Sequence, residues 1–154
     1  MTMQIEELGL RKKVLIIEDE KIDVLSIGRV ISRDFPGVSA EVLTNGEQAL
    51  DWLHRFQPGE STISLVLMDL NIPRMHGLTL LSEFKHHEIL KDVPIVVLSG
   101  NEDPEAIRLA YGAGAFAYVL KRATAPETSA ALTTTLDFWL NVNQVSVPTR
   151  VTEA

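Results

Sequence analysis

The sequence predicts an α/β protein with a parallel sheet between two layers of helices, and three observations lead to this prediction. Five short apolar runs recur along the chain, nearly unbroken rather than alternating, as in strands buried on both faces of a parallel sheet. Segments with helical periodicity separate these runs, so that strands and helices alternate as βα units. Four of the runs end in polar or charged residues, at the place where ligands of open α/β proteins bind. The runs are Val14–Ile17, Ala40–Leu43, Ile63–Met68, Ile95–Leu98 and Ala117–Leu120.

Apolar residues at helical spacing predict a helix after each of the first two strands. The first helix contains apolar residues from Ile22 to Ile31 and is expected to stop near Phe35-Pro36-Gly37. The second is introduced by Asn45-Gly46 and closed by Pro58-Gly59. Both ends consist of residues that favour turns, which supports these limits.

The third helix is expected after Gly77, and the fourth has Pro104 near its start, a position that proline favours. Gly112 and Gly114 are expected to follow the fourth helix. With right-handed crossovers throughout, the βα units form a flavodoxin-like (βα)5 three-layer sandwich. Its five-stranded parallel sheet is expected to have the order 2-1-3-4-5, which places the ends of the first and third strands at the topological switch point.

The last helix is expected to run from near Pro126 to about Asn141. Leucines at i, i+4 and i+8 form a stripe that can cover the sheet, namely Leu132, Leu136 and Leu140. Phe138 and Val142 lie on a different azimuth and are expected to face outward, with Trp139 beside the stripe.

These outward residues form a second apolar strip, which Val145 and Val147 extend. Exposed apolar strips mark interfaces, and a two-fold pairing would bury this one against its own copy. The sequence therefore predicts a homodimer with Phe138, Trp139 and Val142 in its interface.

Length and composition narrow the function further. With 154 residues, 45% of them hydrophobic, the chain can form one domain with a real core. We expect this domain at 13–147, between an N-terminal extension (1–12) and a C-terminal tail (148–154). No apolar run reaches the roughly 18 residues of a membrane helix. The absence of cysteine and of an apolar signal segment favours a cytoplasmic protein. The net charge of −7, without a basic cluster, argues against nucleic-acid binding.

Polar groups at the four strand ends predict one shared site. Glu18 and Asp19 follow the first strand, Asp69 the third, Ser99 the fourth and Lys121 the fifth. Each alone has a simpler interpretation, since Asp69 can end a strand in a turn, Glu18 and Asp19 can belong to a helix cap, and Lys121 can be solvated. Their joint order and placement at strand ends favour a site.

Three converging carboxylates repel one another unless a hard divalent cation binds them. Oxygen ligands and the absence of a His or Cys cluster favour Mg²⁺ over zinc. Asp69 could then attack phosphorus as a nucleophile, while the Lys121 ammonium pairs with a phosphoryl oxygen and the Ser99 hydroxyl donates a hydrogen bond to another.

With these motifs in view, the chain resembles a response-regulator receiver domain from roughly Lys13 to Leu140. The motifs are Val14-Leu15-Ile16-Ile17-Glu18-Asp19-Glu20, Met68-Asp69-Leu70-Asn71-Ile72-Pro73-Arg74-Met75-His76-Gly77, Val97-Leu98-Ser99-Gly100 and Gly114-Ala115-Phe116-Ala117-Tyr118-Val119-Leu120-Lys121. The resemblance implies that Asp69 accepts a phosphoryl group from a sensor histidine kinase and that Lys121 binds the phosphate. It implies that Mg²⁺ is bound directly by Asp19, Asp69 and the backbone carbonyl of Asn71. Glu18 would bind the ion through water. Ser99 and Tyr118 match the switch hydroxyl and the switch aromatic residue.

The length and the Asp137-Phe138-Trp139-Leu140 stretch are similar to those of single-domain regulators that partner bacterial phytochrome kinases. Members of that group tend to dimerise through the last strand and helix.

One departure from the receiver pattern is Arg122, where receivers usually have a proline joined by a cis peptide. Since a non-proline cis bond costs about 2.5–4 kcal/mol, the Lys121–Arg122 bond is expected to be trans. His76, where many receivers have Asp or Asn, is interpreted as an exposed loop residue.

Two other function classes compete with a signalling switch that is not an enzyme. An aspartate-nucleophile phosphohydrolase of the haloacid dehalogenase class carries its nucleophile on its first strand. It requires a second carboxylate two residues after that nucleophile. Here that position is Asn71, after the third strand. A receiver-like binding module that is not phosphorylated would not need the complete set of acceptor, metal ligands and lysine.

Overall fold

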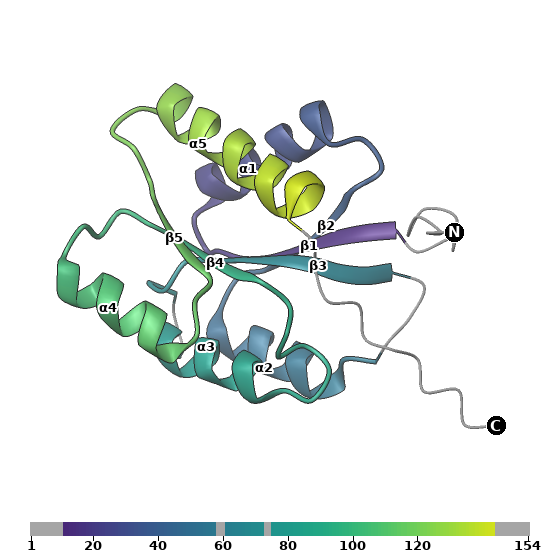
Figure 1. Ribbon diagram of the computed structural model, residues 1–154, viewed down its shortest axis with the longest axis vertical. Coiled ribbons are helices and arrows are strands. Elements are labelled where there is room, and N and C mark those ends of the chain that lie inside the picture. The colour runs from purple at the N-terminus through teal and green to yellow at the C-terminus, as the bar shows by residue number, and fades with distance from the viewer. Residues whose placement is uncertain (1–10, 58–60, 73–74, 144–154) are drawn as a thin grey trace.

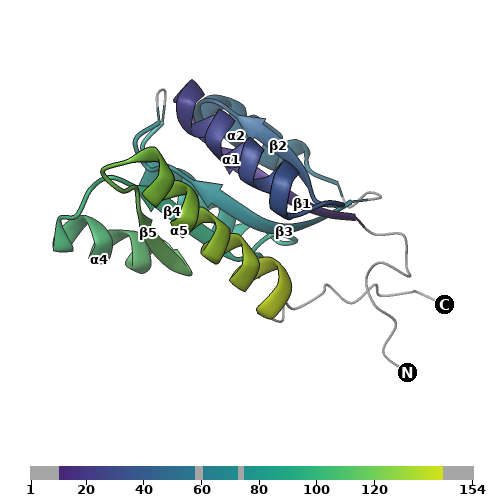
Figure 2. The same ribbon diagram turned by 90° about the horizontal axis from the view of Figure 1, so that it is seen from above.

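The computed structural model describes residues 11–57, 61–72 and 75–143 and has the predicted three-layer architecture. Five parallel strands pair in the order β2-β1-β3-β4-β5. Helices α1 and α5 cover one face of the sheet, and α2, α3 and α4 cover the other (Figures 1 and 2). The strands are β1 (Arg11–Ile17), β2 (Ser39–Leu43), β3 (Ser61–Met68), β4 (Ile95–Ser99) and β5 (Ala117–Leu120). The helices are α1 (Lys21–Asp34), α2 (Gly46–Arg55), α3 (Gly77–His86), α4 (Pro104–Ala113), α5 (Ala125–Asp137) and a π-helical turn, η2 (Phe138–Val142).

The central strand β1 shows why apolar runs without alternation form this sheet. Its side chains point to opposite faces in turn. Leu15 and Ile17 are buried in the core beneath α2 and α3, whereas Val14 and Ile16 are buried in the core beneath α1 and α5. Because helices cover both faces, every position of the run must be apolar. The edge strands differ, since β5 is only half-buried along its length and β2 begins with exposed residues.

The predicted stripe of α5 holds this helix on the sheet. Leu132, Leu136 and Leu140 are all buried in the core beneath α1 and α5. The helix does not remain regular to Asn141, as the sequence pattern predicted, because its last turn widens into η2. The Lys12 ammonium donates a hydrogen bond of 2.5 Å to the Leu140 carbonyl and so ties this turn to β1.

The other predicted helix limits are confirmed except at two glycine-containing ends. Pro104 occupies the first turn of α4, and Gly114 ends this helix with φ of 116°, in the left-handed region that glycine favours. Gly112, expected after the helix, lies within it, because the chain does not turn until Gly114. The second helix ends at Arg55, and the predicted stop at Pro58-Gly59 lies outside the described residues.

Residues 1–10 of the expected N-terminal extension lie outside the described residues, and its last two, Arg11 and Lys12, belong to β1. The expected tail at 148–154, with Val145 and Val147 before it, also lies outside the described residues. Within the described part of the chain, no helix is long and apolar enough to cross a membrane.

Candidate functional site

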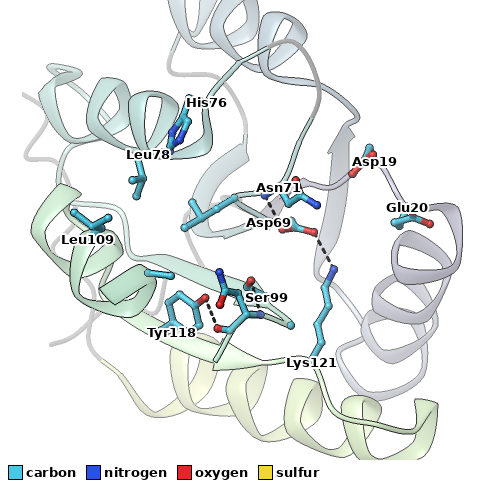
Figure 3. A pocket seen from close by; sticks show the side chains of 14 residues that line it. Asp19, Glu20, Asp69, Asn71, His76, Leu78, Ser99, Leu109, Tyr118 and Lys121 are labelled. Carbon is cyan, nitrogen blue, oxygen red and sulfur yellow. Dashed lines mark hydrogen bonds and ion pairs between the residues drawn. The ribbon is translucent and has the colours of Figure 1, made fainter. Parts of the chain in front are cut away.

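Four of the residues predicted to share a site, Asp19, Asp69, Ser99 and Lys121, line one cleft at the carboxyl edge of the sheet (Figure 3). Short backbone hydrogen bonds hold the strand ends together, because the ladder continues one residue beyond the apolar runs. The Asp69 N–H donates to the Ile17 carbonyl at 3.0 Å, and the Lys121 N–H donates to the Ser99 carbonyl at 2.9 Å. The side chains that follow these strands therefore project into one cleft.

Three carboxylates form the acidic end of this cleft. Glu18, Asp19 and Asp69 each offer a carboxylate oxygen, and these oxygens lie within 4.8 Å of one another. Glu18 and Asp69 are only 2% and 7% exposed, whereas Asp19 is open to solvent. Hard oxygen donors at this spacing, with one side accessible, fit a Mg²⁺ ion that retains several waters.

Lys121 neutralises part of this charge from the opposite wall. Its ammonium Nζ lies 2.9 Å from Asp69 Oδ2, 3.1 Å from Glu18 Oε2 and 2.8 Å from Asp23 Oδ2. The lysine comes from the end of β5, the three carboxylates from β1, α1 and β3. A single cation thus connects the end of β5 to groups that lie 52 to 103 residues earlier in the sequence.

Burial and charge shift the pKa values of two of these groups. Burial, followed by the negative charge of Asp69, raises the pKa of Glu18 to about 7, although hydrogen bonds from the Glu20 N–H and Lys121 oppose this. Burial alone lowers the pKa of Lys121, but its hydrogen bonds to Asp23 and Asp69 and the nearby carboxylate charges outweigh burial and raise it. Lys121 is therefore a permanent cation, and Glu18 gains its charge near neutral pH.

The remaining predicted site residues lie around Asp69 and on the far side of the cleft. The Asn71 N–H donates to Asp69 Oδ1 at 2.9 Å and orients this carboxylate. Ser99 is 8% exposed, and its hydroxyl oxygen accepts a hydrogen bond from the Asn101 N–H at 3.2 Å. The Tyr118 hydroxyl donates to the Asn101 carbonyl at 2.8 Å. Ser99 and Tyr118 are thus connected through Asn101.

His76 and Gly77 shape the rim of the cleft at the start of α3. His76 is exposed, as predicted, and its Nδ1 accepts a hydrogen bond from the Leu78 N–H as an N-cap. A Cβ at Gly77 would overlap the backbone of Leu70, so only glycine fits there. This close approach brings α3 against the loop that carries Asp69.

The loop after Lys121 is held by a donor that proline lacks. The Arg122 N–H donates to the Thr128 hydroxyl at 2.9 Å. The described residues contain no cis peptide, so the Lys121–Arg122 bond is trans, as predicted.

Asp23 is a residue of the site that the sequence pattern did not identify. An acid in the first turn of α1 is ordinarily interpreted as a favourable helix-terminus charge. The ion pair with Lys121 depends on where the fold places the start of α1 relative to the end of β5, which no local pattern reveals.

The predicted interface residues lie away from this cleft, at the end of α5. Phe138 and Val142 are 46% and 59% exposed, as predicted, and Trp139 is half-buried. Trp139 packs edge-on against Phe138 and Phe116, with ring centroids 5.1 and 6.1 Å away. Trp139 therefore bridges the core beneath α5 and an exposed aromatic surface.

Comparisons with known proteins agree with this geometry. A family model described as the response regulator receiver domain matches residues 14–133. The response regulator Rcp1 of Synechocystis is 28% identical over 139 residues, which cover 88% of this chain and 93% of Rcp1. The probable methanogenesis regulatory protein FilR2 of Methanothrix harundinacea is 29% identical over 137 residues, which cover 88% of each chain.

Solved structures of response regulators have the same fold as this chain. The phosphorylated cyanobacterial phytochrome response regulator RcpA has a TM-score of 0.82 and 26% identity, over 89% of this chain and 99% of RcpA. The Mn²⁺-bound form of Rcp1 has a TM-score of 0.79. Other relatives are much longer, and the chain spans 26% and 8% of the length of two of them.

Proposed function

We propose that this chain, which belongs to the response regulator receiver family, accepts a phosphoryl group on Asp69 from a phosphohistidine of a sensor histidine kinase. The observation that supports this role is the position of Asp69. Its buried carboxylate lies between the Lys121 ammonium and two further carboxylates, at an edge open to solvent through Asp19. A nucleophile, a cation for the phosphoryl oxygens and a metal-binding set thus occur within one cleft.

In the proposed transfer, a carboxylate oxygen of Asp69 forms a bond to phosphorus while the phosphorus–nitrogen bond of the donor histidine breaks. The electron pair of that bond stays on the imidazole nitrogen, which takes up a proton. Lys121 stabilises the charge on the phosphoryl oxygens as a compact cation. The Asn71 N–H holds Asp69 in place during the attack.

The residues present fit Mg²⁺, and we assign its ligands from the same cluster. Asp19 and Asp69 would bind the ion directly, together with the backbone carbonyl of Asn71, and Glu18 would bind through water. When bound, Mg²⁺ neutralises the carboxylates and the incoming phosphoryl group. The proximity of the three carboxylates supports this assignment.

Ser99 and Tyr118 are proposed to convert phosphorylation into a change of surface. A phosphoryl group on Asp69 offers the Ser99 hydroxyl a charge-assisted hydrogen bond that is absent beforehand. Because Ser99 and Tyr118 both bond to Asn101, a shift of Ser99 alters the contacts of Tyr118. Such a differential contact shifts a two-state loop.

The phosphohydrolase alternative is disfavoured by Asn71, which lacks the second carboxylate and donates its N–H to Asp69. The unphosphorylated binding module is disfavoured by the buried charges, which are costly to retain without a role. Stoichiometric, slowly reversible labelling supports the switch, whereas turnover of a free phosphoester would support the enzyme.

The kinase partner is proposed to be a bacteriophytochrome in the cytoplasm, because the relative RcpA is named as a phytochrome response regulator. Incubation with candidate sensor kinases tests this proposal. The fastest phosphotransfer should come from a phytochrome kinase, and preference for an unrelated kinase would contradict it.

A homodimer is proposed through Phe138, Trp139 and Val142. Phe138 and Val142 leave apolar surface in water, and Phe116 beside Trp139 adds to it with 40% exposure. Light scattering at tens of micromolar, a working range for weak interfaces, should show a dimer for the wild type and a monomer for Phe138→Asp. A monomeric wild type would contradict the proposal.

Labelling with acetyl phosphate and Mg²⁺ tests the phosphoacceptor directly. The wild type should gain one phosphoryl group by intact mass, and Asp69→Asn should gain none. Asp51→Asn, an exposed aspartate on α2, is the matched control and should label normally. Undiminished labelling of Asp69→Asn would overturn the assignment.

A further inference from the structure

Lys121 is fully engaged before any phosphoryl group arrives. An ammonium has three hydrogens to donate, and the three carboxylates of Glu18, Asp23 and Asp69 accept from it at 3.1, 2.8 and 2.9 Å. To bind a phosphoryl oxygen, Lys121 must give up at least one of these contacts. Which contact remains decides where the ammonium is held.

Two of the three partners belong to the proposed metal site. Glu18 and Asp69 are members of the carboxylate cluster, whereas Asp23 is not. When the cluster binds a divalent cation, the oxygens of Glu18 and Asp69 face a second and stronger positive charge. Their attraction for Lys121 then weakens, and the like charges of metal and ammonium repel each other. Of the partners that the structure describes, Asp23 alone keeps its carboxylate for Lys121.

The surroundings of Asp23 suit a lasting contact. Its side chain is 30% exposed and that of Lys121 is 19% exposed, so the pair is screened less than an ion pair on the open surface. Asp23 stands in the first turn of α1, where the helix dipole favours a negative charge. It also has the shortest contact with Lys121.

We propose that Asp23 is a positioning residue that keeps the Lys121 ammonium beside Asp69 once the metal has bound. Asp23 touches neither the phosphoryl group nor the metal and acts through Lys121 alone. By anchoring one donor of the ammonium, it leaves the other two for phosphoryl oxygens. This inference rests on the proposed function of Asp69 and assigns a role to α1 in the same reaction.

The order of the Lys121 side chain provides a test that does not depend on activity. NMR relaxation of the Lys121 ¹³Cε group, with and without Mg²⁺, should show an ordered side chain in the wild type under both conditions. In Asp23→Asn the side chain should stay ordered without Mg²⁺, held by Glu18 and Asp69, and become mobile when Mg²⁺ is added. Asp34→Asn is the matched control, since it removes an aspartate of equal exposure from the other end of α1. Equal order of Lys121 in Asp23→Asn and the wild type with Mg²⁺ would overturn the proposal.

A double-mutant cycle on the labelling rate with acetyl phosphate tests whether Asp23 acts through Lys121. Asp23→Asn should slow labelling about tenfold, equivalent to about 1.4 kcal/mol. The same change should have no effect in a Lys121→Met background. Equal slowing in both backgrounds would mean that Asp23 acts independently of Lys121, which overturns the proposal. Where Lys121→Met labels too slowly to measure, the NMR comparison decides.

The outcomes separate this inference from the proposed function. If the wild type takes up no phosphoryl group, or Asp69→Asn still does, the phosphoacceptor assignment fails whatever Asp23 does. If the wild type labels on Asp69 and Asp23→Asn labels at the same rate with an ordered Lys121, only the role of Asp23 fails. Circular dichroism and urea unfolding of each variant test whether the fold is retained.

Discussion

Glu18 should make the stability of the metal-free protein depend on pH in an unusual direction for a carboxylate. Its pKa is about 7 in the folded protein against 4.5 ordinarily, because burial and the charge of Asp69 disfavour its ionised form. Between these two values the folded state binds more protons than the unfolded chain. The free energy of unfolding therefore falls as pH rises from below 4.5 to above 7.

The gap between 4.5 and about 7 corresponds to about 3 kcal/mol of stability lost across this range. Lys121 adds no slope there, since its raised pKa lies far to the alkaline side. Glu18→Gln keeps the shape of the side chain and removes its titration. Every other titrating group is common to both proteins, so the difference between them isolates Glu18.

Urea unfolding at pH 5, 6, 7 and 8 in the presence of EDTA measures this effect. The two proteins should be similar at pH 5, and Glu18→Gln should become progressively more stable than the wild type toward pH 8. Saturating Mg²⁺ should remove the loss in the wild type, since metal binding favours deprotonated carboxylates and adds about 2.7 kcal/mol at a hundredfold excess over Kd. Identical pH dependence of the two proteins in EDTA would refute the reasoning.

Three further predictions concern the metal, the rim of the cleft and the core. Asp19→Asn should raise the Kd for Mg²⁺ at least about tenfold by calorimetry, while its exposed position keeps the unfolding free energy within about 0.5 kcal/mol of the wild type; normal affinity would place the metal elsewhere. Gly77→Ala should cost about 1–3 kcal/mol in urea unfolding, because its Cβ would overlap the Leu70 backbone, and unchanged stability would show that the rim can yield. Leu136→Ala should cost about 2–5 kcal/mol, since Leu136 is fully buried, whereas Phe138→Ala should cost at most about 1 kcal/mol; equal costs would contradict the assigned faces of α5.

Local patterns in the sequence are sufficient to predict the strands and the placement of the residues directly after them. The unbroken run Val14–Ile17 predicts a strand buried on both faces, and the polar residues that follow it must emerge at the edge of the sheet. The same reasoning brings Asp69, Ser99 and Lys121 to that edge, because parallel strands all end on the same side. The order 2-1-3-4-5 is confirmed for a related reason, since right-handed crossovers leave few arrangements.

Contacts between distant elements could not be predicted from the sequence, because they depend on how the elements pack in the folded protein. Asp23 is an ordinary acid of a first helical turn until the packing of α1 brings it 2.8 Å from Lys121. The widening of α5 into η2, with Lys12 bonded to the Leu140 carbonyl, likewise involves a partner 128 residues away. Periodicity reports which face of an element is buried, because burial repeats along the chain. A contact between two side chains depends on the rotation and offset of whole elements, which the packing of the entire core sets.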